Sequence, residues 1–344
     1  MPKKLFFHVV LVLIGLVISP VIAFSAAPFY EGKVIRIIVG ASPGGGFDLY
    51  ARTLARHMGR QIPGNPSIIV ENMPGAGHLI AANYVSKVAK PDGLTIGHFA
   101  GSLFISQLME QKGIEFDARK FEFIGAPAKN EVVFAFTKKS GITSTDAWKA
   151  SKKPPKLGGL MAGNHLENAI LISKHVLGFP VQFIEGFKGT ADIRMAVEVG
   201  ELDGICLGWE SLKATWGRLF QAGDMVVALQ GVPKPFPDLA KVPLAIDFAK
   251  TDEARKFIEV GIHYPSVFDR PLLLPPGTSK EQVQLLRRAF QETLKDKEFV
   301  AEAEKAKLEL NPVSGEEVEK LVAGFFNIDT TMKAKLKEII YKVN

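Results

Sequence analysis

The distribution of apolar residues predicts a strand, a turn and a helix near the start of the chain. Val34–Val39 is a nearly continuous apolar run, which is typical of a strand covered on both faces. Pro43 and the glycines Gly44, Gly45 and Gly46 then exclude regular structure. From Phe47 onward, apolar side chains recur with helical spacing. This order leaves backbone N–H groups without partners at the helix N-terminus, so the turn is a candidate anion-binding site.

The same alternation of strand and helix continues along the first half of the chain. Strands are expected at Ser67–Val70 and Leu94–Phe99, followed by helices over His78–Ala89 and from Ser102 to Gln111. Three successive strand–helix units predict a mostly parallel sheet flanked by helices, which is an α/β fold. Ligands of such sheets bind beyond the carboxyl ends of the strands, where the turns after each strand meet.

A second domain is expected after the crossing segment Phe121–Thr137, because the alternation restarts there. We expect strands at Lys156–Met161, Val181–Ile184 and Gly204–Leu207, and a returning strand at Met225–Leu229. The predicted division is a signal peptide over 1–27, a first lobe over 28–128, a second lobe over 129–228, and a return to the first lobe over 229–344. The candidate hinges are 124–130 and 229–232. Thr143, Ser279 and Ser314 are expected to begin helices, the last running to about Tyr341.

The start of the chain has the pattern of a secretory signal peptide. A short basic segment precedes the apolar run Leu5–Ile18 and a stretch of small residues ending at Ala27. We therefore expect export to the periplasm with cleavage of the signal, and an uncleaved anchor is the alternative. Cys206 is the only cysteine, which excludes a disulfide within the chain and a lipid attached at the end of the signal.

Charge and motif spacing exclude several classes of function. The formal net charge is +6, and the basic residues are dispersed without aromatic partners, which argues against nucleic-acid binding. The turn after Val39 has neither the lysine of a phosphate-binding loop nor the glycine spacing of a dinucleotide site. The histidines show no metal-ligand spacing. We therefore expect no cofactor and no metal.

One motif in the turn also fits an enzyme. Gly40-Ala-Ser-Pro-Gly44 matches the Gly-x-Ser-x-Gly nucleophile elbow, with Asp247 and His263 in the expected chain order of a serine hydrolase. The oxyanion hole of that elbow uses the N–H of the residue after the serine, and Pro43 has none. An exported hydrolase using Ser42 is therefore the alternative function.

Six motifs, taken in order, resemble the solute-binding receptors of the tripartite tricarboxylate transporters, also called Bug receptors. They are Lys33–Val39, Pro43–Asp48, Val70–Gly77, Pro91–Thr95, Phe187–Thr190 and Pro275–Thr278. The resemblance implies a two-lobed periplasmic binding protein, type II-like, with a hinge of crossing strands and no catalytic activity. It also implies a small organic carboxylate as ligand, a membrane permease as partner, and a monomeric receptor. A ligand presenter to a membrane sensor kinase is a further alternative.

The resemblance also implies which residues contact the ligand. In the first lobe these are Ala41, Ser42, Gly44, Gly45, Gly46 and Asp48, together with Ala100, Gly101 and Ser102. In the second lobe they are Gly163, Asn164, His165, Phe187, Lys188, Gly189 and Thr190, with Trp209 and Glu210 at the flank. The chain departs from the family pattern mainly in this second lobe, which would contact the end of the solute that lies away from the first lobe.

The residue types leave several of these roles open. Asp48 could bind a water or hold the turn by capping. Capping is favoured because a negatively charged side chain would not help a site to bind an anion. Lys188 could pair with a carboxylate or be solvated, and His165 could contact ligand or finish a cap. Trp209 could stack on a ligand or lie in the core.

Overall fold

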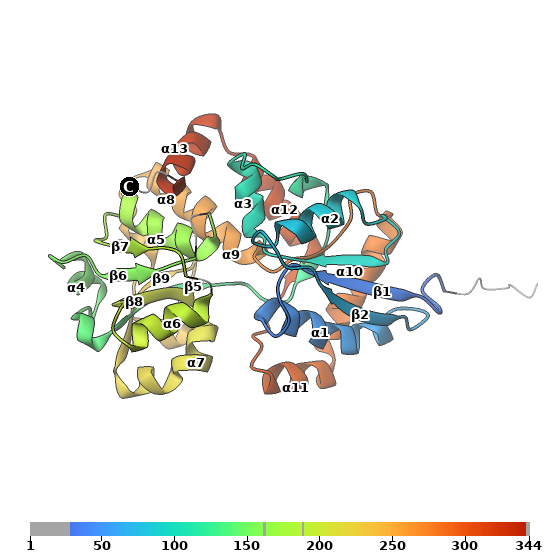
Figure 1. The fold of residues 1–344 in the computed structure, drawn as a ribbon, viewed down its shortest axis with the longest axis horizontal. Coiled ribbons are helices and arrows are strands. Elements are labelled where there is room, and N and C mark those ends of the chain that lie inside the picture. The colour runs from blue at the N-terminus through green and yellow to red at the C-terminus, as the bar shows by residue number, and fades with distance from the viewer. Residues whose placement is uncertain (1–27, 161–162, 188, 342–344) are drawn as a thin grey trace, which may run out of the picture.

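The computed structural model describes residues 28–160, 163–187 and 189–341, so the predicted signal peptide lies outside the described residues. Two β-sheets, each flanked by helices, form two lobes side by side (Figure 1). This is the two-lobed α/β architecture expected from the sequence. No helix among the described residues is long and apolar enough to cross a membrane.

The first lobe contains a six-stranded mixed sheet. Its order is β11 (Val313–Ser314), β4 (Glu122–Ala126), β10 (Leu272–Leu274), β3 (Thr95–His98), β1 (Val34–Val39) and β2 (Ser67–Asn72). β1 lies between β2 and β3 and is parallel to both, with Val39 in register with Asn72 and His98. β10 and β11 are antiparallel to their neighbours. The carboxyl ends of β1, β2 and β3 therefore meet at one edge, as the alternation predicted.

Helices cover both faces of this sheet. They are α1 (Gly46–Met58), α2 (Leu79–Lys87), α3 (Ser102–Leu108), α10 (Lys280–Lys295), α11 (Lys297–Lys305) and α12 (Gly315–Phe326). Ile37 of β1 packs in a cluster with Leu54 of α1 and Leu286 of α10, whereas Ile38 packs in the cluster that includes Val85 of α2. Alternate side chains of β1 thus enter two cores, which explains its continuous apolar run.

The second lobe contains a five-stranded mixed sheet in the order β7 (Gln182–Ile184), β6 (Lys156–Gly158), β8 (Gly204–Gly208), β5 (Val132–Thr137) and β9 (Met225–Gly231). β6 is parallel to β7 and β8, and β5 is antiparallel to β8 and β9. The helices of this lobe are α4 (Thr145–Lys149), α5 (His165–His175), α6 (Thr190–Glu198) and α7 (Trp209–Ala222).

The return to the first lobe differs from the expectation. β9 pairs with β5 in the second sheet, so the strand expected to return belongs to the second lobe. The chain crosses instead through α8 (Asp252–Ile258), a π-helical turn (Glu259–His263) and α9 (Tyr264–Phe268). The π-helical turn packs on α5, and α9 packs on α12 of the first lobe. An apolar pattern cannot show this, because a strand at either sheet has the same alternation.

Helix ends near the C-terminus follow the capping pattern only in part. Ser279 and Ser314 accept hydrogen bonds from the N–H groups of Gln282 and Glu317, which confirms both as N-caps. The cap of α4 is Ser144 and not Thr143. The last predicted helix is two helices, because α12 ends at Phe326 and α13 (Thr330–Tyr341) packs on α5 of the second lobe.

Candidate functional site

The turn between β1 and α1 is held by the carboxylate of Asp48. Its Oδ2 accepts hydrogen bonds from the N–H of Gly44 (2.8 Å) and from Nε of Arg52 (2.9 Å), and its Oδ1 accepts one from Nδ2 of Asn72 (2.9 Å). Nδ2 of Asn72 also donates to the carbonyl of Ala41 (2.9 Å). Asp48 therefore fixes the turn from within, in line with the structural role favoured from the sequence.

This network keeps Asp48 ionised although the residue is only 2% exposed. Burial alone raises the pKa of a carboxyl group. Here the hydrogen bonds from Arg52, Gly44 and Asn72 outweigh burial and lower the pKa of Asp48 to about 2. The turn is consequently shaped before any ligand arrives.

The N-terminus of α1 presents backbone donors without acceptors. Gly45 is the N-cap and forms no side-chain cap, since it has no side chain. Among the described residues, no carbonyl or side chain accepts from the N–H groups of residues 45–48. Gly44, Gly45 and Gly46 are exposed. Such donors, aligned with the helix dipole, form a site for an anion.

The turn after β3 meets the second lobe. Oγ of Ser102 lies 3.4 Å from Oδ1 of Asn164, the N-cap of α5, so two groups predicted for opposite walls are in contact. Gly101 has a packing role: its N–H donates to the carbonyl of Asp269 (2.9 Å), and an added Cβ would lie 1.8 Å from the carbonyl of Phe268. Its N–H is therefore not available to a ligand.

The second-lobe residues occupy varied positions. Gly163 has a positive φ of 100°, and an added Cβ would meet the Tyr341 hydroxyl at 2.6 Å. His165 is buried with Nε2 3.1 Å from the carbonyl of Ile262, and burial lowers its pKa. Phe187 is partly buried against the core of this lobe. Gly189 and Thr190 begin α6, and Lys188 lies outside the described residues.

Trp209 lies in the core, whereas Glu210 is partly exposed. The Trp209 ring is 5% exposed, packs edge-on against Phe220, and donates through Nε1 to the carboxylate of Asp238. It therefore lies in the core, which is the second of the two roles considered. Glu210 is partly exposed and forms an ion pair with Lys213 (2.5 Å).

Several polar side chains near these turns were missed by the sequence reasoning. Arg270 lies against the faces of Phe47 (5.9 Å from Cζ to the ring centre) and Tyr50 (5.7 Å) of α1. The Phe47 ring also packs against His78 and His98. Burial lowers the pKa of His98 to about 4, so this ring is neutral near pH 7. No motif marks these residues, because they come together only through the crossing helices and β10.

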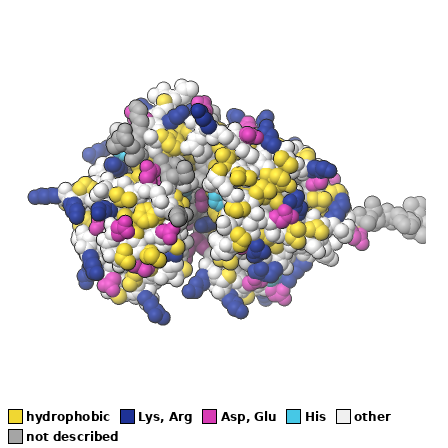
Figure 2. Space-filling model, in the orientation of Figure 1, with side chains coloured by type: hydrophobic (Ala, Val, Ile, Leu, Met, Phe, Trp, Pro, Cys, Tyr) yellow, Lys and Arg dark blue, Asp and Glu magenta, His cyan; other side chains and the backbone are white. Residues whose placement is uncertain are grey.

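Acidic side chains also gather between the lobes. Glu309, on the segment that precedes β11, has a pKa raised to about 7 by burial and by the nearby charges of Glu210 and Glu131. Nδ2 of Asn311 donates to both Glu309 (2.6 Å) and Glu131 (3.2 Å). The space-filling view shows a hollow between the two lobes in which acidic and histidine side chains are visible (Figure 2).

A second acid, Glu167, is buried at the start of α5. It is 1% exposed, and its Oε1 accepts from the N–H of Leu160 (2.7 Å), while Oε2 has no partner among the described residues. Burial raises its pKa to about 7. Within the described chain, no cationic side chain pairs with Glu167 as Arg52 pairs with Asp48.

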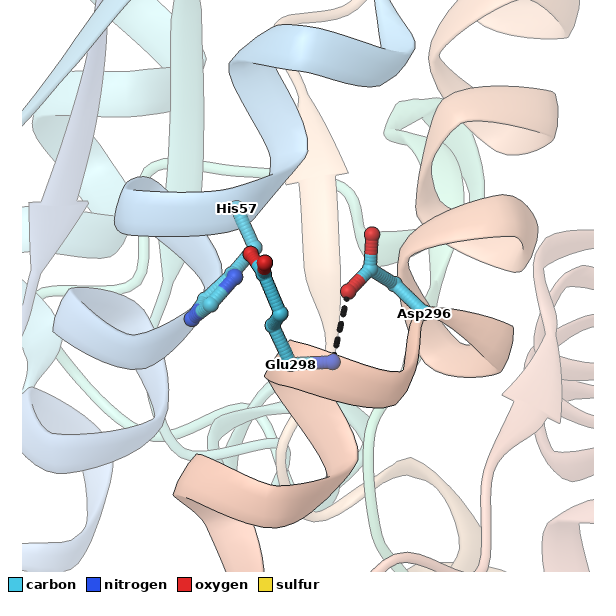
Figure 3. A group of neighbouring side chains, drawn as sticks. All are labelled: His57, Asp296 and Glu298. Carbon is cyan, nitrogen blue, oxygen red and sulfur yellow. Dashed lines mark hydrogen bonds between the residues drawn. The ribbon is translucent and has the colours of Figure 1, made fainter.

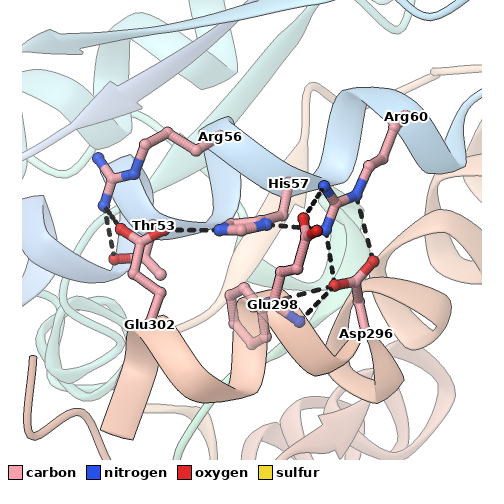
Figure 4. Close-up of polar contacts among 8 residues, drawn as sticks. Thr53, Arg56, His57, Arg60, Asp296, Glu298 and Glu302 are labelled. Atoms are coloured by element: carbon pink, nitrogen blue, oxygen red, sulfur yellow. Dashed lines mark hydrogen bonds and ion pairs between the residues drawn. The ribbon is translucent and has the colours of Figure 1, made fainter. Parts of the chain in front are cut away.

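The one group of described residues with metal-ligand geometry is an ion-pair network. His57, Asp296 and Glu298 bring ligand atoms within 4.8 Å of one another (Figure 3). Arg60 joins all three, at 2.6 Å from Oδ1 of Asp296, 2.5 Å from Oε2 of Glu298 and 3.0 Å from Nδ1 of His57 (Figure 4). A guanidinium in this place repels a cation, so we interpret the cluster as the contact between α1 and α11.

A large cavity of the second lobe lies away from the predicted site. It has a volume of about 990 Å³ and is lined by α6, α7 and the ends of β5 and β9, including Glu198, Trp216 and Asp224. None of the predicted ligand-binding residues lines it. This cavity of the second lobe is thus separate from the predicted site between the lobes.

The three residues considered for a serine hydrolase, Ser42, Asp247 and His263, are not connected by hydrogen bonds in the described part of the chain. Asp247 accepts a hydrogen bond from the N–H of Leu244 (3.1 Å), and Nε2 of His263 is buried without a partner among the described residues. No hydrogen bond links either residue to Ser42 in the described part of the chain. The geometry does not show the relay that such a mechanism needs.

The chain has the two-lobed α/β fold of periplasmic binding proteins. Its neighbours among solved structures are TctC and Bug solute-binding proteins. A TctC solute-binding protein from Polaromonas has a TM-score of 0.69 at 20% identity, covering 91% of this chain and 100% of that chain. The periplasmic binding protein BugD has a TM-score of 0.65 at 20% identity, covering 90% and 98%. Rpa4515 of R. palustris, solved with adipate, has a TM-score of 0.65 at 18% identity, covering 90% and 98%.

Sequence comparison points the same way over shorter segments. The chain is 44% identical over 70 residues to a UPF0065 protein of Bordetella pertussis, covering 20% of this chain and 21% of that protein. The matches to curated relatives span 21% to 32% of the relatives' length. No protein-family model matches the chain. The likeness to TctC and Bug receptors that the motifs indicated is therefore confirmed, with the shared fold as its strongest part.

Proposed function

We propose that this chain is an extracytoplasmic receptor that captures a small organic carboxylate between its two lobes. The observation that carries the proposal is the exposed N-terminus of α1, where the N–H groups of residues 45–48 have no acceptor among the described residues. These donors attract a carboxylate without a buried charge that would itself need pairing. The fold supports the proposal, and so does the adipate bound by Rpa4515.

The contacts refine the set of ligand-binding residues. The proposal keeps Ser42, Gly45 and Gly46 in the first lobe, with Asp48 holding their turn. Ala41, Gly44, Ala100 and Ser102 border them, and Gly163, Asn164, His165, Phe187, Gly189, Thr190 and Glu210 belong to the opposing wall. Gly101 and Trp209 act through packing. Lys188, which lies outside the described residues, remains a proposed partner of the carboxylate.

Closure of the lobes is the proposed mechanism of capture. Each lobe offers one wall, so a ligand that touches both favours the closed form over the open one. The segment between β4 and β5 and the helical crossing from α8 to α9 connect the lobes and are the proposed hinges. The receptor would act in the periplasm as a monomer after cleavage of the signal and deliver its solute to a membrane permease.

A thermal-shift screen of the mature chain tests the proposal. The panel is adipate, succinate, citrate and benzoate, with the diamides of adipate and succinate as neutral controls. A ligand that binds only the folded form raises the melting temperature by mass action. We expect at least one acid to raise it and its amide not to.

The same screen separates the receptor from the serine hydrolase. Ser42→Ala should retain binding of the acid, and the wild-type chain should not hydrolyse a p-nitrophenyl ester any faster than the variant does. Ester hydrolysis that disappears in Ser42→Ala, with no acid bound by either protein, would overturn the proposal.

A further inference from the structure

Arg270 stands where the two predicted first-lobe turns converge. It follows Asp269, whose carbonyl accepts the N–H of Gly101 from the turn after β3. Its guanidinium rests on Phe47 and Tyr50, which belong to the first two turns of α1. The side chain therefore lies beside the first two turns of α1, and its charge also acts on His165 at the start of α5 in the second lobe.

No acidic side chain forms an ion pair with the Arg270 guanidinium within the described chain, although the charge of Arg270 acts on Glu309 and opposes the rise in its pKa that burial causes. Among the described residues, no ion pair or hydrogen bond engages its side chain, and Nε is buried without an acceptor. Asp269, the preceding residue, forms no ion pair with it among the described contacts, and Oδ2 of Asp269 accepts from Nδ2 of Asn130 (3.0 Å). By contrast, Arg287 of the same lobe, which is more deeply buried than Arg270, pairs with Glu316 and Glu319.

An arginine side chain that is partly buried and unpaired destabilises the fold unless a partner supplies hydrogen-bond acceptors and negative charge. The penalty for removing a charge from water is offset only by hydrogen bonds and opposite charge. Stacking on two aromatic rings stabilises and orients the guanidinium, but it leaves the planar set of N–H donors unused. That set matches the two oxygens of a carboxylate.

We propose that Arg270 is a specificity-determining residue of the cleft, whose guanidinium pairs with a carboxylate of the bound solute. This inference rests on the proposed function and adds a charged side chain to the first-lobe wall, which is so far built from backbone donors. The rings of Phe47 and Tyr50 hold the guanidinium beside the α1 N-terminus. The ligand class is accordingly an acid in its ionised form, selected over the corresponding amide.

The test uses the mature chain and the tightest-binding acid of the panel, with its amide as the neutral probe. Arg270→Gln removes the charge, and Arg270→Lys keeps the charge but removes the planar donors. Arg288→Gln is the matched control, because Arg288 is exposed on α10 of the same lobe. Isothermal titration gives the dissociation constants, and melting without ligand reports on folding.

We expect Arg270→Gln to weaken binding of the acid at least about tenfold and Arg270→Lys to weaken it less. Binding of the amide, and binding by Arg288→Gln, should not change. Unliganded Arg270→Gln loses the contacts with Phe47 and Tyr50 but no ion pair among the described residues, so its melting temperature should fall by only about a few degrees.

Two results overturn the inference while the proposed function stands. One is unchanged acid binding by Arg270→Gln, and the other is a much lower melting temperature of the unliganded variant with affinity retained, which indicates a structural arginine. If the wild-type chain binds no acid of the panel, the proposed function itself fails and the inference fails with it.

Discussion

Asp48 and Glu167 occupy the same position in two helices that begin alike. Each is the third residue after an N-cap that forms no side-chain cap, in the first helix after a parallel strand of its lobe. Both side chains are almost wholly buried. Yet the pKa of Asp48 is lowered to about 2, and the pKa of Glu167 is raised to about 7.

The difference shows that the helix dipole alone does not decide the charge of a buried acid. Asp48 has Arg52 and two further donors, whereas Glu167 has the N–H of Leu160 and an oxygen without a partner among the described residues. Where no cation offsets burial, burial raises the pKa of the carboxyl group. The α1 N-terminus is therefore exposed and preshaped, while the α5 N-terminus is buried around an acid whose pKa burial raises to about 7. We infer that the first lobe supplies the anion site and the second supplies closure and shape.

The largest expected effect concerns Glu167. Its pKa in the folded chain lies above the ordinary value of 4.5, so the unfolded chain ionises first and the folded chain loses stability between pH 4.5 and about 7. Glu167→Gln removes this dependence. The free energy of unfolding of the variant, relative to wild type, should rise by about 3 kcal/mol from pH 4 to pH 7.5, measured with urea.

Glu304→Gln is the control for that experiment, because Glu304 is exposed on α11. A relative stability of Glu167→Gln that stays constant over this pH range would show that Glu167 is ionised inside the fold.

A somewhat smaller effect is expected at Asp48. Its lowered pKa contributes stability that is present above the ordinary value of 3.8 and is lost as the pH falls toward 2. Asp48→Asn should lower the free energy of unfolding by about 2 kcal/mol at pH 6, and the difference should vanish near pH 2.

Asp192→Asn provides the comparison, since Asp192 holds the same helical position in α6 but is exposed. Equal losses in the two variants would mean that the hydrogen bonds of Asp48 add nothing beyond the helix dipole.

The fold was largely predictable because it follows from local patterns. The apolar run Val34–Val39, the glycine turn and the α1 periodicity all lie within a few turns of chain, and each is present in the structure. β9 was expected to carry the chain back to the first lobe but pairs within the second sheet, because its alternation fits either place. The break between α12 and α13 was missed because apolar residues continue on both sides of it.

The candidate site was predictable only where it is local. The backbone donors near Gly45 could be anticipated, because a helix start is a property of consecutive residues. Arg270 could not, because its position beside Phe47 depends on the crossing from α8 to β10. Trp209 has the same sequence context in the core as in a binding site, and only its contact with Asp238 decides between them.

The central claim is that backbone donors at the α1 N-terminus bind the carboxylate, and the most direct test compares Gly45→Asp with Gly45→Asn by isothermal titration of the tightest acid of the panel. Gly45 has a φ of −83°, and an added Cβ would meet only the Ser42 carbonyl at 3.7 Å, so both side chains fit and differ in charge alone. We predict that Gly45→Asp binds the acid at least about tenfold more weakly than Gly45→Asn. Equal affinities of the two variants would contradict the account.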